Sequence, residues 1–392
     1  MYTNNAHSIL ILLLMILPGA AWPQQGKSIQ WTAMPDLPDS LGVAGAFAGV
    51  HANRLIIAGG ANFPAAMPWA GGKKHYTRAV YVLERSGHWQ SFELDEPFAY
   101  GASVSLPAAH STSAGSDFPG GIICLGGENT TGISRRVFWL RWDPVQHRPL
   151  QQPLPSLPQP LTNPGATAIG HIVYVAGGEN TSVATDAFYS LDLDHPAKGW
   201  TTLPPLPLAL SNAAVVAQAG RIFVIGGRTK TPSGISRLHG TVYSYDPEHR
   251  RWAREIDLEK NWSAGPALPV GDSAILLLGG DHGEIFHHIE QLNAAIANVS
   301  ETASAADTTR RRLQQEKLTL VESHPGFSRD LWLYDVRNHR WHTLGQLPFP
   351  TAVTTTAVRW GDEWIIPSGE VKPGRRTNRI LSGKFIGYDH AK

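Results

Sequence analysis

The sequence contains a single cysteine, Cys124, in 392 residues. One thiol excludes an intramolecular disulfide, and it excludes thiolate metal centres because these need two or more cysteines. Charged residues are also scarce, at 17% of the chain against about 25% in an average globular protein. Since 33 basic residues face 32 acidic ones, the net charge is only +1. We therefore expect neither a nucleic acid nor an anionic membrane as a partner.

Long hydrophobic runs are missing as well. The longest one near the start, Ile9 to Leu17, is followed by Pro18 and by the small residues Gly19, Ala20 and Ala21. This run is far shorter than the ~20 residues needed to span a bilayer, so a membrane anchor is the weaker interpretation. The pattern predicts a signal peptide over residues 1–21. The mature chain, residues 22–392, is then expected outside the cytoplasm, in the periplasm, and not bound to a membrane.

Glycine, proline and tryptophan are abundant, with 39, 29 and 13 residues. Short β-rich runs that end in paired glycines recur along the chain, and their second glycines are Gly60, Gly127, Gly178, Gly227 and Gly280, with a sixth run, WIIPSG, ending at Gly369. The three central intervals are 51, 49 and 53 residues long, close to the ~50 residues of a kelch repeat. Most runs are followed by an aromatic residue and then a Trp, as in Tyr189 and Trp200. The pattern resembles the kelch repeat family.

These repeats predict an all-β fold, a six-bladed kelch-type β-propeller. The last repeat supplies three strands, and IQWTAMPDLP near the start has the form that ends a blade elsewhere. We therefore expect the N-terminal strand to complete the C-terminal blade. Two insertions interrupt the period, one over 61–76 and one over about 283–327. In the second, the apolar spacing from Ile285 to Val299 predicts an amphipathic helix, and a further helix is expected around Arg310 to Val321. This places a helical insertion in the fifth blade.

The residues that follow the glycine pairs should gather at one mouth of the central channel. They are Ala61, Glu128, Glu179, Arg228, Asp281 and Glu370. Any one of them could be an ordinary solvated loop end. Glu370 stands apart because its loop, GEVKPGRRT, also contains Lys372, Arg375 and Arg376. Such cations can orient a carboxylate and hold an anionic substrate beside it.

Four segments together resemble one enzyme family. They are GVAGAFAGV (42–50), IIAGGANF (56–63), AYGASVSLP (99–107) and GEVKPGRRT (369–377). The resemblance is to the bacterial N-acetylneuraminate epimerases, or sialate mutarotases, which are periplasmic six-bladed kelch propellers. The better-known members carry the GExKPGxRT segment before GVAGxFAG, whereas here it lies near the C-terminus. The chain thus looks like a cyclically permuted branch of the family.

The resemblance implies roles for individual residues. Glu370 matches the family's proton acceptor, and Arg376 matches a ligand-binding residue of its active site, here expected to hold the sugar carboxylate. Lys372, Arg375, Tyr100, Asn62, Glu128, Glu179 and Arg228 are candidate substrate-binding residues. The implied reaction interconverts the α and β anomers of sialic acid by ring opening. The acid that protonates the ring oxygen is left open among Tyr100, water, Glu128 and Glu179.

Other functions have weaker support. His282, His287 and His288 do not have the spacing of a helical zinc site, so no metal and no cofactor is expected. The Gly-x-Ser-x-Gly motif of esterases and the repeated boxes of sialidases are missing. The main alternative is a non-catalytic kelch propeller that binds a glycan or a protein at the same mouth. The expected partner is a small sugar acid, and a homodimer is compatible with the sequence.

Overall fold

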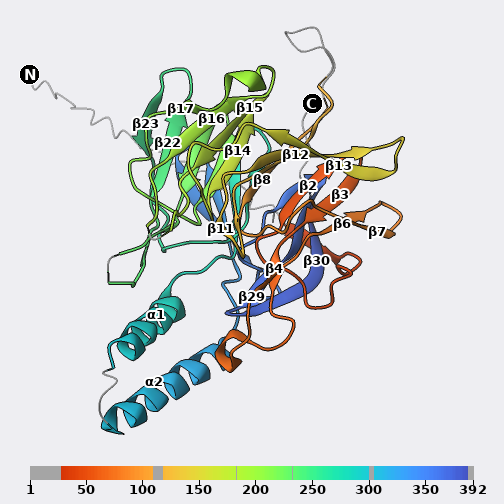
Figure 1. Cartoon of the computed structure of the whole chain (residues 1–392). Helices are drawn as coiled ribbons and strands as arrows, with labels where there is room; N and C mark the ends of the chain where they lie inside the picture. Colours follow the sequence, from red (N-terminus) through yellow and green to blue (C-terminus); the bar gives the residue numbers. More distant parts are fainter. Residues whose placement is uncertain (1–27, 109–117, 182, 232, 300–303, 387–392) are drawn as a thin grey trace, which may run out of the picture.

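The computed structural model describes residues 28–108, 118–181, 183–231, 233–299 and 304–386, so the predicted signal peptide lies outside the described residues. The described residues form six four-stranded sheets arranged in a ring (Figure 1). Neighbouring strands within each sheet are antiparallel. The predicted six-bladed β-propeller is therefore confirmed. None of the described helices is long and apolar enough to cross a membrane.

Each of the first three blades uses four strands that follow one another in the chain, apart from short strands in the loops. Blade 1 contains β2 (Phe47–His51), β3 (Arg54–Ala58), β6 (Ala79–Leu83) and β7 (Trp89–Glu93). Blade 2 contains β8 (Ala102–Leu106), β9 (Gly121–Leu125), β12 (Val137–Asp143) and β13 (Arg148–Leu154). Blade 3 contains β14 (Gly165–Ile169), β15 (Ile172–Ala176), β16 (Phe188–Asp192) and β17 (Thr201–Thr202).

The next two blades repeat this order, and the last blade joins the two ends of the fold. Blade 4 contains β18 (Ala214–Gln218), β19 (Arg221–Ile225), β22 (Val242–Asp246) and β23 (Arg251–Arg254). Blade 5 contains β24 (Ala267–Val270), β25 (Ala274–Leu278), β26 (Asp330–Asp335) and β27 (Arg340–Gln346). Blade 6 contains β28 (Val358–Trp360), β29 (Glu363–Lys372), β30 (Arg375–Ile386) and β1 (Ser28–Ala33). Strand β1 pairs with β30 from Ser28 opposite Ile386 to Ala33 opposite Leu381, which confirms the predicted closure.

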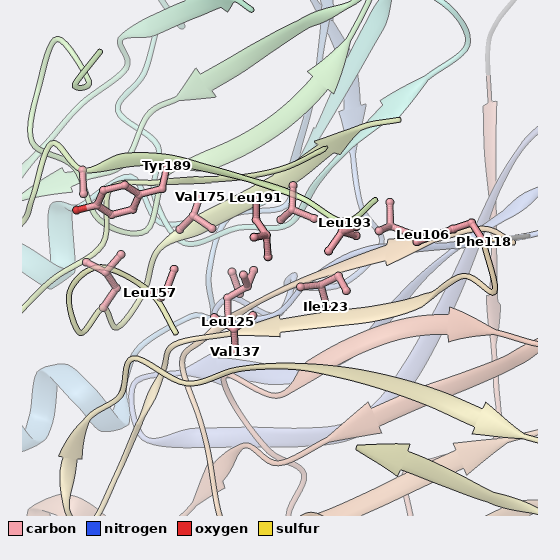
Figure 2. Packing of buried hydrophobic residues seen from close by; sticks show 14 residues of the cluster. Leu106, Phe118, Ile123, Leu125, Val137, Leu157, Val175, Tyr189, Leu191 and Leu193 are labelled. Atoms are coloured by element: carbon pink, nitrogen blue, oxygen red, sulfur yellow. The ribbon is translucent and has the colours of Figure 1, made fainter. Parts of the chain in front are cut away.

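The core lies between the blades. In the described residues, each of the six blade-to-blade interfaces holds one cluster of buried apolar side chains. Figure 2 shows the cluster between blades 2 and 3, with Ile123 and Leu125 of one sheet facing Val175 and Leu191 of the other. Strands covered on both faces must be apolar throughout, as β9 and β15 are. Burial between sheets thus explains the β-rich runs of the sequence.

Tryptophans of the outer strands link neighbouring blades, as the repeat pattern predicted. The indole N–H of Trp252 in blade 4 donates to the carbonyl of Pro204, which follows blade 3, at 3.0 Å. Trp341 in blade 5 donates in the same way to Ile256 at 2.9 Å. Each of these indoles therefore ties its own blade to the connection that precedes it.

A closed ring of backbone hydrogen bonds surrounds the channel axis. In each blade, one residue just before the first strand has a left-handed backbone, and its N–H donates to the carbonyl of the equivalent residue in the preceding blade, at 2.7–3.1 Å. The six residues are Gly45, Tyr100, Asn163, Asn212, Ala264 and Thr354. A cavity of about 1080 Å³ runs along the first strands from this ring toward the opposite face. The ring therefore separates the cavity from the mouth that carries the predicted site.

Both insertions follow the second strand of a blade. The first, in blade 1, contains β4 (Ala61–Asn62), the 3-10 helix η1 (Pro68–Ala70) and β5 (His75–Tyr76). The second, in blade 5, contains α1 (Glu284–Ala297) and α2 (Ser304–Glu322), so the predicted helical insertion is confirmed. Helix α1 ends before Val299, and α2 begins before the expected Arg310. The remaining short elements are β10 (Glu128–Asn129), β11 (Gly132–Ile133), β20 (Arg228–Thr229), β21 (Arg237–Leu238) and η2 (Pro196–Lys198).

Candidate active site

The residues that follow the glycine pairs form a circle at one mouth of the propeller. Each makes a backbone bridge to a residue next to the hydrogen-bonded ring, such as Glu370 with Val353 and Glu179 with Thr162. The same bridge recurs for Ala61, Glu128, Arg228 and Asp281. Because the bridge fixes each backbone at the same height, the six side chains emerge around one opening. We call this opening the mouth.

The GEVKPGRRT segment is a β-hairpin rather than the loop expected from the sequence. Strand β29 continues to Lys372 and β30 begins at Arg375, with Glu370 directly opposite Arg376. The turn uses Gly374, whose φ of 77° suits glycine. Since the two strands belong to blade 6, the carboxylate and the guanidinium are held side by side by sheet pairing. A loop would not fix them in this way.

Glu370 is a largely buried carboxylate whose negative charge is only partly balanced by its neighbours. Its Oε1 accepts a hydrogen bond from the Gly374 N–H at 2.6 Å and lies 3.8 Å from Nη1 of Arg376. Burial raises the pKa of Glu370, while Arg376, the Gly374 N–H and Lys74 lower it and Asp281 raises it further. The net shift of the pKa is upward. Such a carboxylate holds a proton more readily than an ordinary one, as a general base working near neutral pH requires.

Arg376 is positioned by partners from three elements. Its Nε donates to the carbonyl of Ala61 at 3.2 Å, and its Nη2 donates to the hydroxyl of Tyr100 at 3.1 Å. Its guanidinium carbon lies 4.6 Å from the centre of the Phe63 ring. Nη1 is buried and has no hydrogen-bond partner among the described residues. An unpaired buried donor is costly unless a ligand satisfies it.

The first insertion covers this hairpin. A side chain added at Gly374 would meet the Trp69 ring at 2.8 Å, which shows how closely η1 packs on the turn. The insertion then returns through Lys74 and Tyr76. The Lys74 ammonium lies 4.5 Å from the centre of the Tyr100 ring and 3.2 Å from Oε1 of Glu128. Blade 1 thus supplies a second cation close to the hairpin of blade 6.

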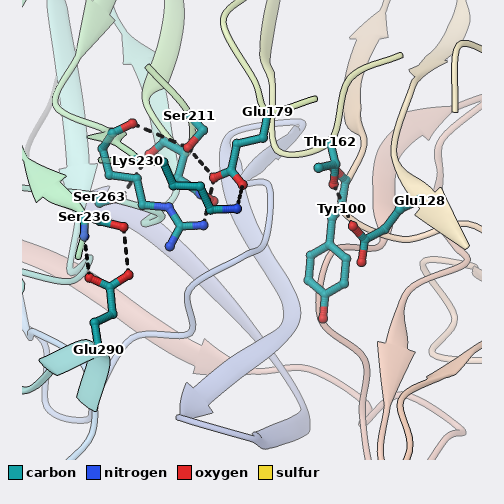
Figure 3. Close-up of polar contacts among 11 residues, drawn as sticks. Tyr100, Glu128, Thr162, Glu179, Ser211, Lys230, Ser236, Ser263 and Glu290 are labelled. Carbon is teal, nitrogen blue, oxygen red and sulfur yellow. Dashed lines mark hydrogen bonds and ion pairs between the residues drawn. The ribbon is translucent and has the colours of Figure 1, made fainter. Parts of the chain in front are cut away.

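Glu128 acts as an acceptor in this group. Its Oε1 accepts from the Tyr76 hydroxyl at 2.7 Å. Its Oε2 accepts from the Thr162 hydroxyl at 3.3 Å (Figure 3). Burial and the bond to Glu128 raise the pKa of Tyr76 to about 12. The Lys74 ammonium completes the set. Glu128 is therefore surrounded by hydrogen-bond donors.

Glu179 lies in a different electrostatic setting. Its Oε1 accepts from the Ser211 hydroxyl at 2.6 Å and from Nη2 of Arg228 at 2.8 Å, and its Oε2 lies 2.9 Å from the Lys230 ammonium. Burial alone would raise the pKa of Glu179, but Arg228, Ser211 and Lys230 more than offset it, so the net shift is downward. This carboxylate is permanently charged near neutral pH.

The predicted residues separate into two groups. One group contains Glu370, Arg376, Tyr100 and Glu128. The other contains Glu179 and Arg228, which form an ion pair at the same mouth. Lys372 lies beside Arg376 in the wall of a smaller cavity of about 330 Å³, whereas Arg375 is exposed.

Asn62 is held by the segment between β1 and β2, because its amide N–H group donates to Asp39 and to the Gly42 carbonyl, both at 3.0 Å. Its buried Oδ1 has no partner among the described residues. Asn62 therefore serves first to fix the backbone around β4.

Sequence reasoning missed Lys74, Tyr76, Phe63, Lys230 and Phe286. The first three lie in the insertion ANFPAAMPWAGGKKHY. The signal that could have marked them as site residues is an aromatic residue or a lysine close to a glycine pair. The three histidines considered as a zinc site do not converge, since no cluster of three metal-ligating side chains occurs among the described residues.

The comparison with known families agrees with this geometry. The family model described as N-acetylneuraminate epimerase matches residues 154–390, which include the whole hairpin of blade 6. The chain belongs to the N-acetylneuraminate epimerase family.

Among curated relatives, N-acetylneuraminate epimerase of Brucella melitensis is 31% identical over 228 residues, which are 57% of this chain and 56% of that protein. The Haemophilus influenzae protein of the same name is 26% identical over 60% of each chain. The Escherichia coli K12 protein is 26% identical over 60% of this chain and 61% of its own length. The chain thus matches somewhat more than half the length of these relatives.

Proposed function

We propose that this protein is an N-acetylneuraminate epimerase that interconverts the α and β anomers of its sugar by opening the ring. One observation carries the proposal. A largely buried carboxylate with a raised pKa, Glu370, lies 3.8 Å from a guanidinium whose buried Nη1 has no hydrogen-bond partner in the described part of the chain. Base and anion-binding group are thus adjacent, as a 2-keto sugar acid requires because its carboxylate is attached to the anomeric carbon.

The proposed reaction begins with Arg376 binding the sugar carboxylate. Glu370 takes the proton of the anomeric hydroxyl, the C–O double bond of the ketone forms, and the bond from the anomeric carbon to the ring oxygen breaks. An acid gives the ring oxygen a proton. The open chain then rotates, and the same steps in reverse close the ring on the opposite face of the ketone. Every proton is returned, so the reaction needs no oxidant, reductant or cofactor.

Tyr100 is the proposed acid. Of the acids considered from the sequence, Glu128 accepts hydrogen bonds from Tyr76 and Thr162 and faces Lys74, while the pKa of Glu179 is lowered. Glu128 thus acts as a hydrogen-bond acceptor, and the lowered pKa of Glu179 makes it a poor proton donor. The Tyr100 oxygen instead accepts from Arg376, so its own proton is available to another acceptor. The guanidinium would also stabilise the phenolate that remains after proton transfer.

The test is the rate of anomer exchange. We expect purified protein to increase exchange between the anomers of N-acetylneuraminate, measured by saturation-transfer NMR, far above the rate in buffer. The same experiment with a neutral ketose shows whether the carboxylate is needed. Exchange no faster than the buffer background would overturn the proposal and favour a propeller that only binds a glycan or protein.

We also propose that the protein is exported to the periplasm. The support is the sequence of residues 1–21, with its short apolar run and small residues before Trp22. Intact-mass analysis of the protein from a periplasmic extract should show a chain that begins near Trp22. A product that retains Met1 and stays in the cytoplasm would contradict export without affecting the proposed activity.

A further inference from the structure

The order of the blades determines which mouth residues face one another. Since the hydrogen-bonded ring closes through six consecutive blades, a residue of blade 6 lies across the axis from its equivalent in blade 3. Glu370 is therefore opposite Glu179, and Arg228 of blade 4 is opposite Ala61 of blade 1. A sugar whose anomeric carbon is held at Glu370 and Arg376, and whose tail crosses the axis, reaches blades 3 and 4.

The cluster on that side has unused hydrogen-bonding capacity. Figure 3 shows Glu179 between Ser211 and Lys230, on the side of Thr162 away from Glu128. Arg228 donates through Nη2 to Glu179, but its Nε is buried and has no hydrogen-bond partner among the described residues. The charge of Arg228 is thus balanced, while one of its donors remains available.

Helix α1 of the second insertion forms a fixed wall beside this cluster. The Phe286 ring centre lies 5.4 Å from the guanidinium carbon of Arg228. One helical turn later, Glu290 accepts from the Ser236 N–H at 2.6 Å and from the Ser236 hydroxyl at 2.7 Å (Figure 3). Ser236 belongs to the loop between β20 and β21 of blade 4. These two bonds hold α1 against the loop that carries Arg228.

Helix α1 also carries an unpaired polar atom. Nε2 of His287, the residue after Phe286, is buried and has no hydrogen-bond partner within the described residues. Unpaired buried polar atoms such as this one and Nε of Arg228 are costly unless water or a polar ligand satisfies them.

We infer that Glu179 and Arg228, with Phe286 of helix α1 as a wall, form a second subsite that binds the polyhydroxyl tail of the sugar acid. This inference rests on the proposed function. A hydroxyl group both donates and accepts, so adjacent hydroxyls can donate to the Glu179 carboxylate and accept from Arg228. Glu179 already pairs with both Arg228 and Lys230, so a second carboxylate would have to share these cations with a like charge beside it. The subsite therefore fits neutral hydroxyls better than an anion.

The experiment compares two sugars on four proteins. The sugars are intact N-acetylneuraminate and an analogue with a shortened tail. The analogue is made by periodate oxidation and borohydride reduction of a glycoside of the sugar, which protects the anomeric carbon, followed by release of the free sugar. The proteins are wild type, Arg228→Met, Phe286→Ala and the control Arg135→Met. Arg135 donates to the Leu157 carbonyl at 2.7 Å, outside the cluster of Glu179 and Arg228, and so matches the change in size and charge. The ratio of kcat/KM for the two sugars is measured from anomer exchange over several concentrations.

We expect the wild type and Arg135→Met to prefer the intact sugar by about 10-fold or more, because truncation leaves buried polar groups unpaired. Arg228→Met should lose most of this preference, because kcat/KM should fall for the intact sugar and should stay close to the wild-type value for the shortened one. Phe286→Ala should lose part of it and leaves the ion pairs of the cluster in place, so it remains informative if Arg228→Met folds poorly. Full preference in both variants would overturn the subsite.

The same proteins separate this inference from the proposed function. If the wild type catalyses no exchange, the proposed function fails, and calorimetric affinities for the two sugars then test the subsite on their own. Equal affinities of the wild type for both sugars would overturn the subsite. If the wild type catalyses exchange with no preference for the intact sugar, the proposed function stands and the subsite fails.

Discussion

Glu179 and Glu370 occupy the same position in opposite blades, each directly after a glycine and each bridged to the backbone beside the ring. Their surroundings differ. Glu179 has Arg228, Lys230 and Ser211 in contact, whereas Glu370 has one backbone N–H and a guanidinium at 3.8 Å. Burial raises the pKa of both acids, but only at Glu179 do the neighbouring groups more than offset this effect. The net pKa shift is therefore downward at Glu179 and upward at Glu370.

The comparison shows how a repeated fold specialises one copy of a position. The propeller provides equivalent places around the mouth, and the number of neighbouring cations then decides the behaviour of each acid. A carboxylate that is fully paired binds and orients. One that is buried with less compensation is able to exchange a proton. The acid that we propose as the proton acceptor is thus the one with the less favourable charged state.

The largest expected effect separates the two acids by rate. Glu370→Gln removes the basic oxygen and keeps the shape of the side chain, so turnover should fall by about 10²-fold or more. Glu179→Gln should leave turnover within a few-fold of wild type, since its carboxylate holds no exchangeable proton. Saturation-transfer NMR at saturating sugar measures both. A large loss of turnover in Glu179→Gln would mean that the roles are reversed or shared.

The second effect separates them by stability. Glu179→Gln leaves Arg228 and Lys230 without their buried partner, and it should lower the free energy of unfolding by about 2 kcal/mol. Glu370→Gln should not lower it at neutral pH, because the neutral form is the one that its surroundings favour. Urea unfolding followed by tryptophan fluorescence compares the two variants. Equal losses in both would show that the two sites are energetically alike.

The third effect concerns Arg376, the cation beside Glu370 that we propose binds the sugar carboxylate. Arg376→Lys keeps the charge but loses the planar donor group that contacts Ala61 and Tyr100. We expect the apparent affinity for the sugar to fall by about 10-fold, with a smaller change in turnover. The matched control is Arg375→Lys on the exposed side of the same hairpin. If both variants bind the sugar equally well, Arg376 does not bind the carboxylate.

The repeat arithmetic of the sequence predicted the propeller, the closure by β1 and the helical insertion. It succeeded because paired glycines and apolar strands depend on local backbone and burial requirements that every blade shares. The difference between Glu179 and Glu370 could not be predicted in this way. It depends on Lys230, which follows Arg228 by two residues and forms a second ion pair with Glu179. Among the described residues, Glu370 has no such second ion pair beside Arg376. The permuted order of the family segments stays a prediction.

Lys74 and Tyr76 illustrate the same limit. They are distant in sequence from Glu128 and meet it only because the first insertion folds across from blade 1 to the neighbouring blade. No spacing within the segment indicates this contact. In contrast, Glu370 and Arg376 were identifiable because both lie in one short motif, although the sequence did not show that the motif is a hairpin.

The smallest effect is the most specific, because the two acids should respond to pH with opposite signs. The pKa of Glu179 is lowered in the folded protein, so its stabilising contribution is present above the ordinary value of 4.5 and is lost as the pH falls through the lower folded value. The pKa of Glu370 is raised, so its contribution is present below 4.5 and is lost as the pH rises through the higher folded value.

The stability deficit of Glu179→Gln should therefore shrink as the pH falls below 4.5, whereas Glu370→Gln should gain stability relative to the wild type as the pH rises above 4.5, each by about 1 kcal/mol or less. Urea unfolding at several pH values measures this. Glu255→Gln is a useful third variant, because Glu255 lies away from the mouth and has a lowered pKa: burial would raise it, but Ser244, His339 and Tyr334 offset that. Its stability deficit should also shrink in acid, with the same sign as that of Glu179→Gln. If Glu370→Gln also follows Glu179, the proton affinity of Glu370 is not raised, and another group at the mouth must act as the base.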